Sequence, residues 1–203
     1  PATVTAATGI DAMVHAIEAY TSALKKNPLS DLLAREALRL LAANLDEVVS
    51  NGSNREARQA MLLGACLAGQ AFANAPVAAV HALAYPLGGH FHIPHGLSNA
   101  LVLPQVLAFN APAAAPLYAE LAPLVLGEQL RAGSAAAQTE QLIEALAGFS
   151  QRSGLPTRLR DAGVSEAMLP TLAADAMLQQ RLLVNNPREM NEQQALAIYQ
   201  AAY

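Results

Sequence analysis

The sequence is poor in aromatic residues, cysteine and charge, and each shortage excludes a class of protein. It has no tryptophan, and aromatic residues make up 4% of its 203 residues. No run rich in β-branched or aromatic residues alternates with polar ones, so we expect no β-sandwich or barrel. A single cysteine, Cys66, excludes an intramolecular disulfide and fits a reducing, cytoplasmic compartment.

Charged residues are also few, at 14%, and the net charge is −4. This balance gives no excess of positive charge that would favour binding to nucleic acid or to an anionic membrane. We expect no uncharged apolar run of the 18 residues that a membrane span needs. A signal peptide is not expected either, because the first stretch lacks a basic start and soon reaches Asp11. The chain opens at Pro1 and not at Met, so we expect a processed chain or a piece of a longer one.

The apolar fraction, 53%, is rich in Ala and Leu, which favours closely packed helices. We therefore predict one all-α domain over residues 1–203. Capping residues and apolar spacing predict helices at 31–49 (capped by Ser30-Asp31), 55–72, 97–108, 116–126, 136–153 and 166–178, with Asn186-Pro187-Arg188-Glu189 opening a last helix to Tyr203. Residues 127–135 are predicted to form a loop. Pro86, Gly88, Gly89 and Pro94 predict that 75–96 is not one regular element.

Cys66 lies among Leu63, Gly64, Ala65, Leu67 and Ala68, so we expect it to be a small buried hydrophobe. The pair Gly88-Gly89 is a weak candidate for a phosphate cradle, because no G-x-G-x-x-G follows a strand. For Asn186-Pro187-Arg188 we favour a structural role, with Arg188 tying parts of the molecule together.

The chemistry-bearing residues are a carboxylate and a cluster of histidines. Asp11 and His15 are four residues apart, so on a helix both side chains can reach one ion. Four of the five histidines lie within 15 residues, at 81, 90, 92 and 95. Imidazole is the commonest protein ligand of metals. An ordinary helix and a polar loop would explain the same residues, and from spacing alone the two interpretations remain open.

Two segments decide between these interpretations by resemblance. Residues 7–22, ATGIDAMVHAIEAYTS, and 80–100, VHALAYPLGGHFHIPHGLSNA, are similar to the signatures of iron-containing (group III) alcohol dehydrogenases, as is the late Asn-Pro-Arg. The resemblance implies the all-helical, carboxyl-terminal half of the dehydroquinate synthase-like fold. It also implies that Asp11, His15, His81 and His95 are the four metal ligands, and that His90 and His92 are not.

Further roles follow from the resemblance. Tyr85 stands where many members carry a histidine near the nicotinamide, so it is the candidate catalytic residue, although a phenol is a poor base at neutral pH. Phe72 and Asn74 resemble residues on the nicotinamide side of the cleft, while helix packing and a helix cap explain them equally well. His92 is a further candidate on the cofactor side, as part of a proton route.

The resemblance implies a function with three alternatives. We expect the metal-binding catalytic domain of an NAD(P)-dependent alcohol dehydrogenase that acts on a small-molecule alcohol or aldehyde. The expected metal is Fe(II), with Zn, Ni, Co and Mn as alternatives. The second alternative is a relative of the hydroxyacid–oxoacid transhydrogenases or of the maleylacetate reductases. Of these two, Tyr85 modestly favours the transhydrogenase. The third is a truncated helical module without turnover of its own. The resemblance also implies that family members carry an amino-terminal α/β nucleotide-binding domain, which we expect to be absent from this chain. We expect this small-molecule substrate as a partner and neither nucleic acid nor a membrane. A homodimer is possible.

Overall fold

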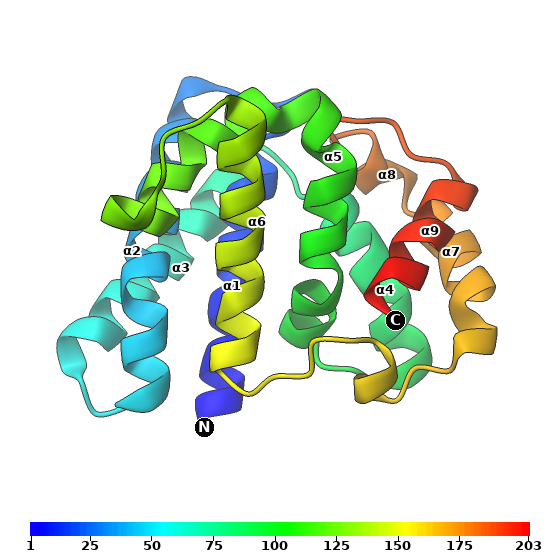
Figure 1. Cartoon of the computed structure of the whole chain (residues 1–203), viewed down its shortest axis with the longest axis horizontal. Helices are drawn as coiled ribbons and strands as arrows, with labels where there is room; N and C mark the ends of the chain where they lie inside the picture. Colours follow the sequence, from blue (N-terminus) through cyan, green and yellow to red (C-terminus); the bar gives the residue numbers. More distant parts are fainter.

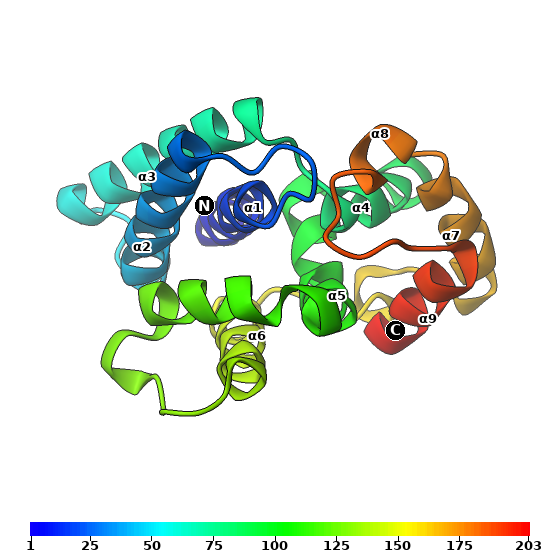
Figure 2. The ribbon, with the colours of Figure 1, turned by 90° about the horizontal axis from the view of Figure 1, so that it is seen from above.

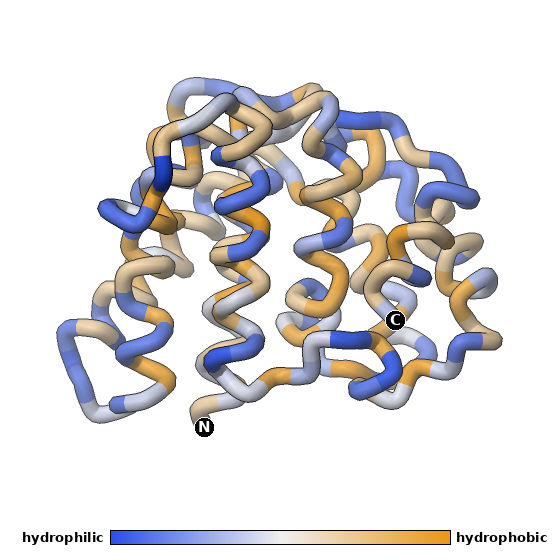
Figure 3. Tube along the Cα trace, in the orientation of Figure 1, coloured by the Kyte–Doolittle hydropathy of each residue, from blue (hydrophilic) through white to orange (hydrophobic).

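The computed structural model describes all 203 residues and contains helices without any strand, which confirms the all-α prediction. The helices are α1 (Ala2–Tyr20), α2 (Pro28–Ser50), α3 (Arg55–Asn74), α4 (Ala79–Phe91), α5 (His95–Leu126), η1 (Gly127–Gln129), α6 (Ala135–Arg152), η2 (Arg160–Ala162), η3 (Glu166–Met168), α7 (Leu169–Met177), α8 (Gln180–Leu183) and α9 (Glu192–Ala202). In Figure 3 hydrophobic residues recur along the helices, and several connecting loops are hydrophilic.

Helix α1 forms the centre of the molecule. Seen from above, it lies between the pair α2 and α3 on one side and α5 with α6 on the other (Figures 1 and 2). Its residues are buried around most of its circumference, including Ile10, Met13 and Ile17, as expected of a helix surrounded by others. Gly9 allows close packing, because a Cβ there would lie 2.6 Å from Leu45 Cδ1.

Helices α2 and α3 form an antiparallel pair over one face of α1 (Figure 2). The cap of α2 is Asn27, whose side chain accepts the Ser30 N–H, so the predicted Ser30-Asp31 cap is wrong by one turn. The prediction of a buried Cys66 is also wrong, since Cys66 is exposed. Helix α3 buries only a narrow stripe of small residues, and Cys66 lies outside this stripe. The stripe consists of Ala57, Gly64, Ala68 and Ala71.

Residues 75–96 are more regular than the sequence predicts. Most of this region forms α4, which continues through Pro86. Proline removes one helical hydrogen bond, but burial of the apolar residues from Ala79 to Leu87 outweighs that loss. The helix ends at His92, which has a left-handed backbone with φ of 55°. Only Ile93 and Pro94 separate this end from the first residue of α5.

The two helices predicted at 97–108 and 116–126 are a single helix, α5, with prolines at 104, 112, 116 and 123. Figure 1 shows that α5 changes direction along its course, as expected where prolines interrupt the hydrogen-bond ladder.

By length and composition, α5 with η1 could cross a membrane, and α3 with α4 passes the same test as a pair bent by 106°. The expectation that no such run exists is therefore wrong. Buried core helices pass this test too, and α5 packs against α1, α4, α6 and α9.

The carboxyl-terminal part packs on the outer side of α4 and α5 (Figure 2). Asn186 does not open the last helix as predicted, because α9 begins at Glu192 with Asn191 as its cap. Instead, the Asn186 side chain pairs with the Asn110 side chain of α5 through two amide hydrogen bonds of 2.7 and 3.0 Å. Arg188 donates to the Phe109 carbonyl at 2.6 Å and lies over the Phe109 ring. These contacts fit the structural role predicted for this motif.

Candidate metal centre

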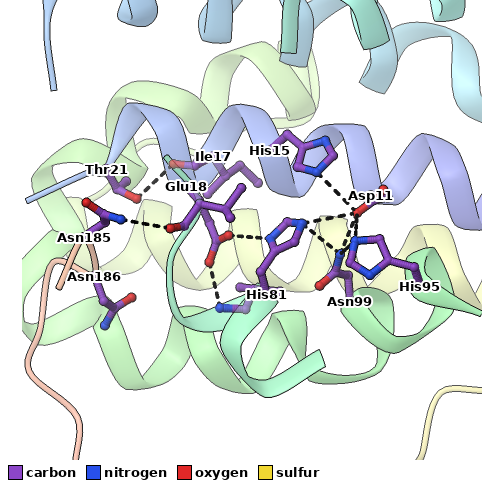
Figure 4. A network of polar contacts seen from close by, with 12 residues as sticks. Asp11, His15, Ile17, Glu18, Thr21, His81, His95, Asn99, Asn185 and Asn186 are labelled. Atoms are coloured by element: carbon purple, nitrogen blue, oxygen red, sulfur yellow. Dashed lines mark hydrogen bonds and ion pairs between the residues drawn. The ribbon is translucent and has the colours of Figure 1, made fainter. Parts of the chain in front are cut away.

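Three helices bring four donor side chains to one point. Asp11 and His15 lie one turn apart on α1, His81 lies near the start of α4, and His95 is the first residue of α5. One ligand atom from each lies within 4.8 Å of the others. Figure 4 shows the three imidazole rings directed toward the Asp11 carboxylate. The four residues that the resemblance implied as ligands are therefore neighbours in space, although 84 positions separate Asp11 from His95.

The spacing of these atoms fits a metal ion. Oδ1 of Asp11 lies 3.8 Å from Nε2 of His15, 3.6 Å from Nε2 of His81 and 3.5 Å from Nε2 of His95. Ligands at about 2.1 Å from a tetrahedral ion are about 3.4 Å from one another. One carboxylate and three imidazoles also form a donor set that first-row divalent metals bind well.

The electrostatics of the cluster keep its acid ionised. Burial opposes ionisation of Asp11, but a hydrogen bond with His81 and the nearby charges of His15 and His95 lower the pKa of Asp11 below its ordinary value. Burial lowers the pKa of His15, which favours its neutral form, the form that binds metals. Burial acts in the same direction on His81, but hydrogen bonds with Asp11 and Glu18 outweigh it and raise the pKa of His81 to about 9.

Asn99 is part of the cluster, and sequence reasoning missed it. Its side-chain nitrogen Nδ2 lies 2.5 Å from Asp11 Oδ1, 3.2 Å from His81 Nε2 and 3.3 Å from His95 Nε2. The amide thus fills part of the space between the donor atoms, and its buried Oδ1 has no hydrogen-bond partner. An available signal was its place one helical turn after His95, in a long uncharged stretch.

Glu18 is the second residue that sequence reasoning missed. It is 4% exposed, and its Oε2 lies 2.7 Å from Nδ1 of His81, on the opposite side of the ring from Asp11 (Figure 4). A carboxylate is seldom buried without a partner. The signal available in the sequence was therefore a glutamate inside an apolar helix, three residues after His15.

The rings of Tyr85 and Phe72 lie beside the donor cluster. The Tyr85 ring is 6.0 Å from the His95 ring and 6.4 Å from the His81 ring, measured between centroids, and is half-buried. The Phe72 ring lies 4.6 Å from that of His15. Phe72 therefore covers one side of the cluster, and Tyr85 lies at its edge.

The other candidates lie outside the donor cluster. Asn74 is exposed at the end of α3, and its side chain donates a hydrogen bond to the Gln70 carbonyl of its own helix. His92 is exposed and ends α4. His90 is also exposed, and its Nε2 lies 2.6 Å from Asp175. Neither histidine contributes a donor atom to the cluster.

Comparison with known proteins identifies the family of the chain. The family model described as "Fe-containing alcohol dehydrogenase family, C-terminal" matches residues 5–203. The chain belongs to this family. A 1,3-propanediol dehydrogenase of Klebsiella pneumoniae is 43% identical over 203 residues, and a long-chain-alcohol dehydrogenase of Geobacillus thermodenitrificans is 44% identical over the same length. Each match covers all of this chain, but only 52% of the Klebsiella protein and 51% of the Geobacillus protein.

Solved structures of the Fe-containing alcohol dehydrogenase family show the same fold. A crystal structure of a 1,3-propanediol oxidoreductase superposes with a TM-score of 0.95 at 43% identity, covering all of this chain and 52% of that one. An alcohol dehydrogenase of Oenococcus oeni superposes with the same TM-score at 37% identity. The chain therefore spans about half the length of the relatives that it matches, and the family description places the match at the carboxyl-terminal half.

Proposed function

We propose that this chain is the metal-binding half of an NAD(P)-dependent alcohol dehydrogenase, and that Asp11, His15, His81 and His95 hold its divalent ion. The convergence of four donor atoms within 4.8 Å carries the proposal. Family membership supports it, because the family is described by its iron content. Residues 1–203 form, on this proposal, one catalytic domain, and a separate nucleotide-binding domain completes the enzyme.

The family description supports Fe(II) as the metal, and the donor set is compatible with it. Zinc, nickel, cobalt and manganese suit the same ligands. When bound, a divalent ion supplies Lewis-acid activation of the alcohol oxygen. The chain's own contribution is to hold the donors in place. His15 packs between Phe72 and His81, with ring centroids 4.6 and 4.8 Å apart. These contacts limit the rotation of the His15 imidazole.

The chain itself does not fit a nicotinamide dinucleotide. The pyrophosphate of such cofactors is held by a Gly-rich turn between a parallel strand and a helix N-terminus, and none of the 203 residues forms a strand. Phe72, Asn74 and His92 would contribute at most the nicotinamide side of a shared site, as proposed from the resemblance. We therefore propose that turnover requires a counterpart of the half of the relatives that these 203 residues do not cover.

The substrate that we propose is a primary alcohol or its aldehyde. Relatives that cover the whole chain act, by their names, on 1,3-propanediol and on long-chain alcohols. They support this alternative over the transhydrogenase and reductase alternatives, for which Tyr85 is the only feature in this chain. We also propose a cytoplasmic location, which the single cysteine supports.

A chimaera tests the proposal directly. The chain would be joined to the amino-terminal half of the Klebsiella pneumoniae relative, loaded with Fe(II) and assayed with NAD and 1,3-propanediol. We expect saturable turnover by the chimaera, none by the 203-residue chain, and loss of turnover in His81→Ala of the chimaera. His90→Ala is the matched control, because His90 lies outside the donor cluster, and it should retain activity. Turnover by the chain alone, or equal turnover by the His81→Ala chimaera, would contradict the proposal.

A further inference from the structure

Glu18 touches two groups of α4 from within α1. One carboxylate oxygen, Oε2, lies 2.7 Å from Nδ1 of His81, and the other, Oε1, accepts the Val80 N–H at 2.7 Å. Both residues of the Glu18–His81 pair are nearly inaccessible, with 5% and 2% of their side-chain surface exposed. The two bonds therefore form where water does not compete for them.

The bond to Val80 caps α4 from another helix. The residue at the cap position, Ala78, offers no side-chain cap, and Val80 is the second residue of α4. The first N–H groups of a helix have no partner within it and favour a negative charge nearby. Glu18 thus satisfies one of these N–H groups and fixes the first turn of α4, which carries His81.

The bond to His81 determines which ring nitrogen faces the donor cluster. An ionised carboxylate only accepts hydrogen bonds, so Nδ1 of His81 must carry the hydrogen. The opposite nitrogen, Nε2, points to Asp11 at 3.6 Å. In a neutral ring with hydrogen on Nδ1, Nε2 presents its lone pair to the centre of the cluster.

We propose that Glu18 is the positioning residue of the metal centre, holding His81 in the orientation and the tautomer in which Nε2 is the donor to the metal. This inference rests on the metal centre proposed above. Carboxylates that orient ligand histidines in this way contribute strongly to metal binding, and their loss costs about 10–100-fold in metal affinity.

The variant Glu18→Gln separates positioning from simple packing. Glutamine has nearly the same shape, and its oxygen still accepts the Val80 N–H. Its amide nitrogen, however, donates to Nδ1 of His81, which moves the hydrogen of the neutral ring to Nε2. The exposed Glu47→Gln is the matched control. It removes the same charge from a carboxylate bonded only to Asn51 and Asn54 on the surface.

Zinc titration of the 203-residue chain gives the first readout. We expect Glu18→Gln to bind zinc about 10–100-fold more weakly with a melting temperature close to that of the natural chain. Glu47→Gln should bind zinc like the natural chain. Unchanged zinc affinity in a folded Glu18→Gln would overturn the inference, as would an equal loss in Glu47→Gln.

Nitrogen-15 NMR of His81 gives the second readout and needs no variant. In the metal-free chain at alkaline pH, where the ring is neutral, the natural chain should carry its hydrogen on Nδ1. A hydrogen on Nε2 in the natural chain would contradict the inference, even if Glu18→Gln failed to fold. If the natural chain bound no zinc at all, the proposed metal centre would fail, while the NMR measurement would still decide the role of Glu18.

Discussion

At the scale of single residues, Tyr85 is the side chain beside the donor cluster that we propose as the catalytic residue. It lies one helical turn after His81 and at the edge of the cluster, with its ring nearly perpendicular to that of His81. It differs from the histidine that many members of the family carry there, and a phenol is a poorer base than an imidazole at neutral pH.

We predict that Tyr85→Phe, in the chimaera described above, reduces turnover by about tenfold or less. Groups that carry the proton in the transition state typically contribute about 10²–10⁴-fold, and activation of the alcohol by the metal lessens the need for such a group. The measurement is the pH–rate profile of the chimaera and of its Tyr85→Phe variant, with the metal content of each determined. A loss on the order of a thousandfold with full metal content, together with loss of a basic limb, would show that Tyr85 carries the proton.

The residues of the site could be predicted from the sequence to different degrees. The convergence of the four donors could be predicted, because two signature segments contain them and spacing places Asp11 and His15 on one helix face. Glu18 and Asn99 could not be, although both lie within the quoted segments. Their roles depend on the distance between α1, α4 and α5, which no local pattern specifies.

At the scale of elements, the close approach of α5 to α1 holds His95 near Asp11. A Cβ on Gly96 would lie 2.7 Å from the carbonyl carbon of Ala7 in α1 and 3.2 Å from the Thr8 nitrogen. These atoms belong to the backbone of a central helix and cannot move aside as a flexible side chain can. Gly96 therefore sets the separation of the two helices at the donor cluster.

We predict that Gly96→Ala destabilises the chain by about 1–3 kcal/mol and weakens zinc binding, because α5 must shift and carry His95 with it. Gly89→Ala is the matched control, since a Cβ at this exposed helical position meets nothing within 4 Å. It should be neutral or stabilise by up to about 1 kcal/mol. Urea unfolding and zinc titration of both variants provide the data. A Gly96→Ala chain as stable as the natural one would refute this account of the helix contact.

The same elements show where local patterns mislead. Pro86, Gly88 and Gly89 suggested an irregular segment, and the prolines of α5 suggested two helices. Both segments are helical because their apolar residues are buried against several neighbours, and that burial outweighs one lost hydrogen bond per proline. In contrast, α6 lies within one residue of its predicted bounds, because Ser134 caps it and no proline interrupts it.

At the scale of the whole molecule, the fold brings three helices from distant parts of the sequence to one cluster. Helix α1 supplies two donors and the buried Glu18, while α4 and α5 meet across a two-residue connection and supply one donor each. The fold class could be predicted from composition and periodicity. The packing of α7, α8 and α9 beside α4 and α5 could not be predicted, since their contacts include single bonds such as that from the Tyr199 hydroxyl to the Leu83 carbonyl.

The central claim is that these 203 residues form one metal centre, and anomalous diffraction from crystals loaded with zinc or Fe(II) tests it most directly. The account predicts one strong peak at about 2.0–2.2 Å from a carboxylate oxygen of Asp11 and from Nε2 of His15, His81 and His95. The peak should vanish in crystals of His81→Ala. A map without a peak at this point, or with the metal held instead by the exposed pair His90 and Asp175, would contradict the claim.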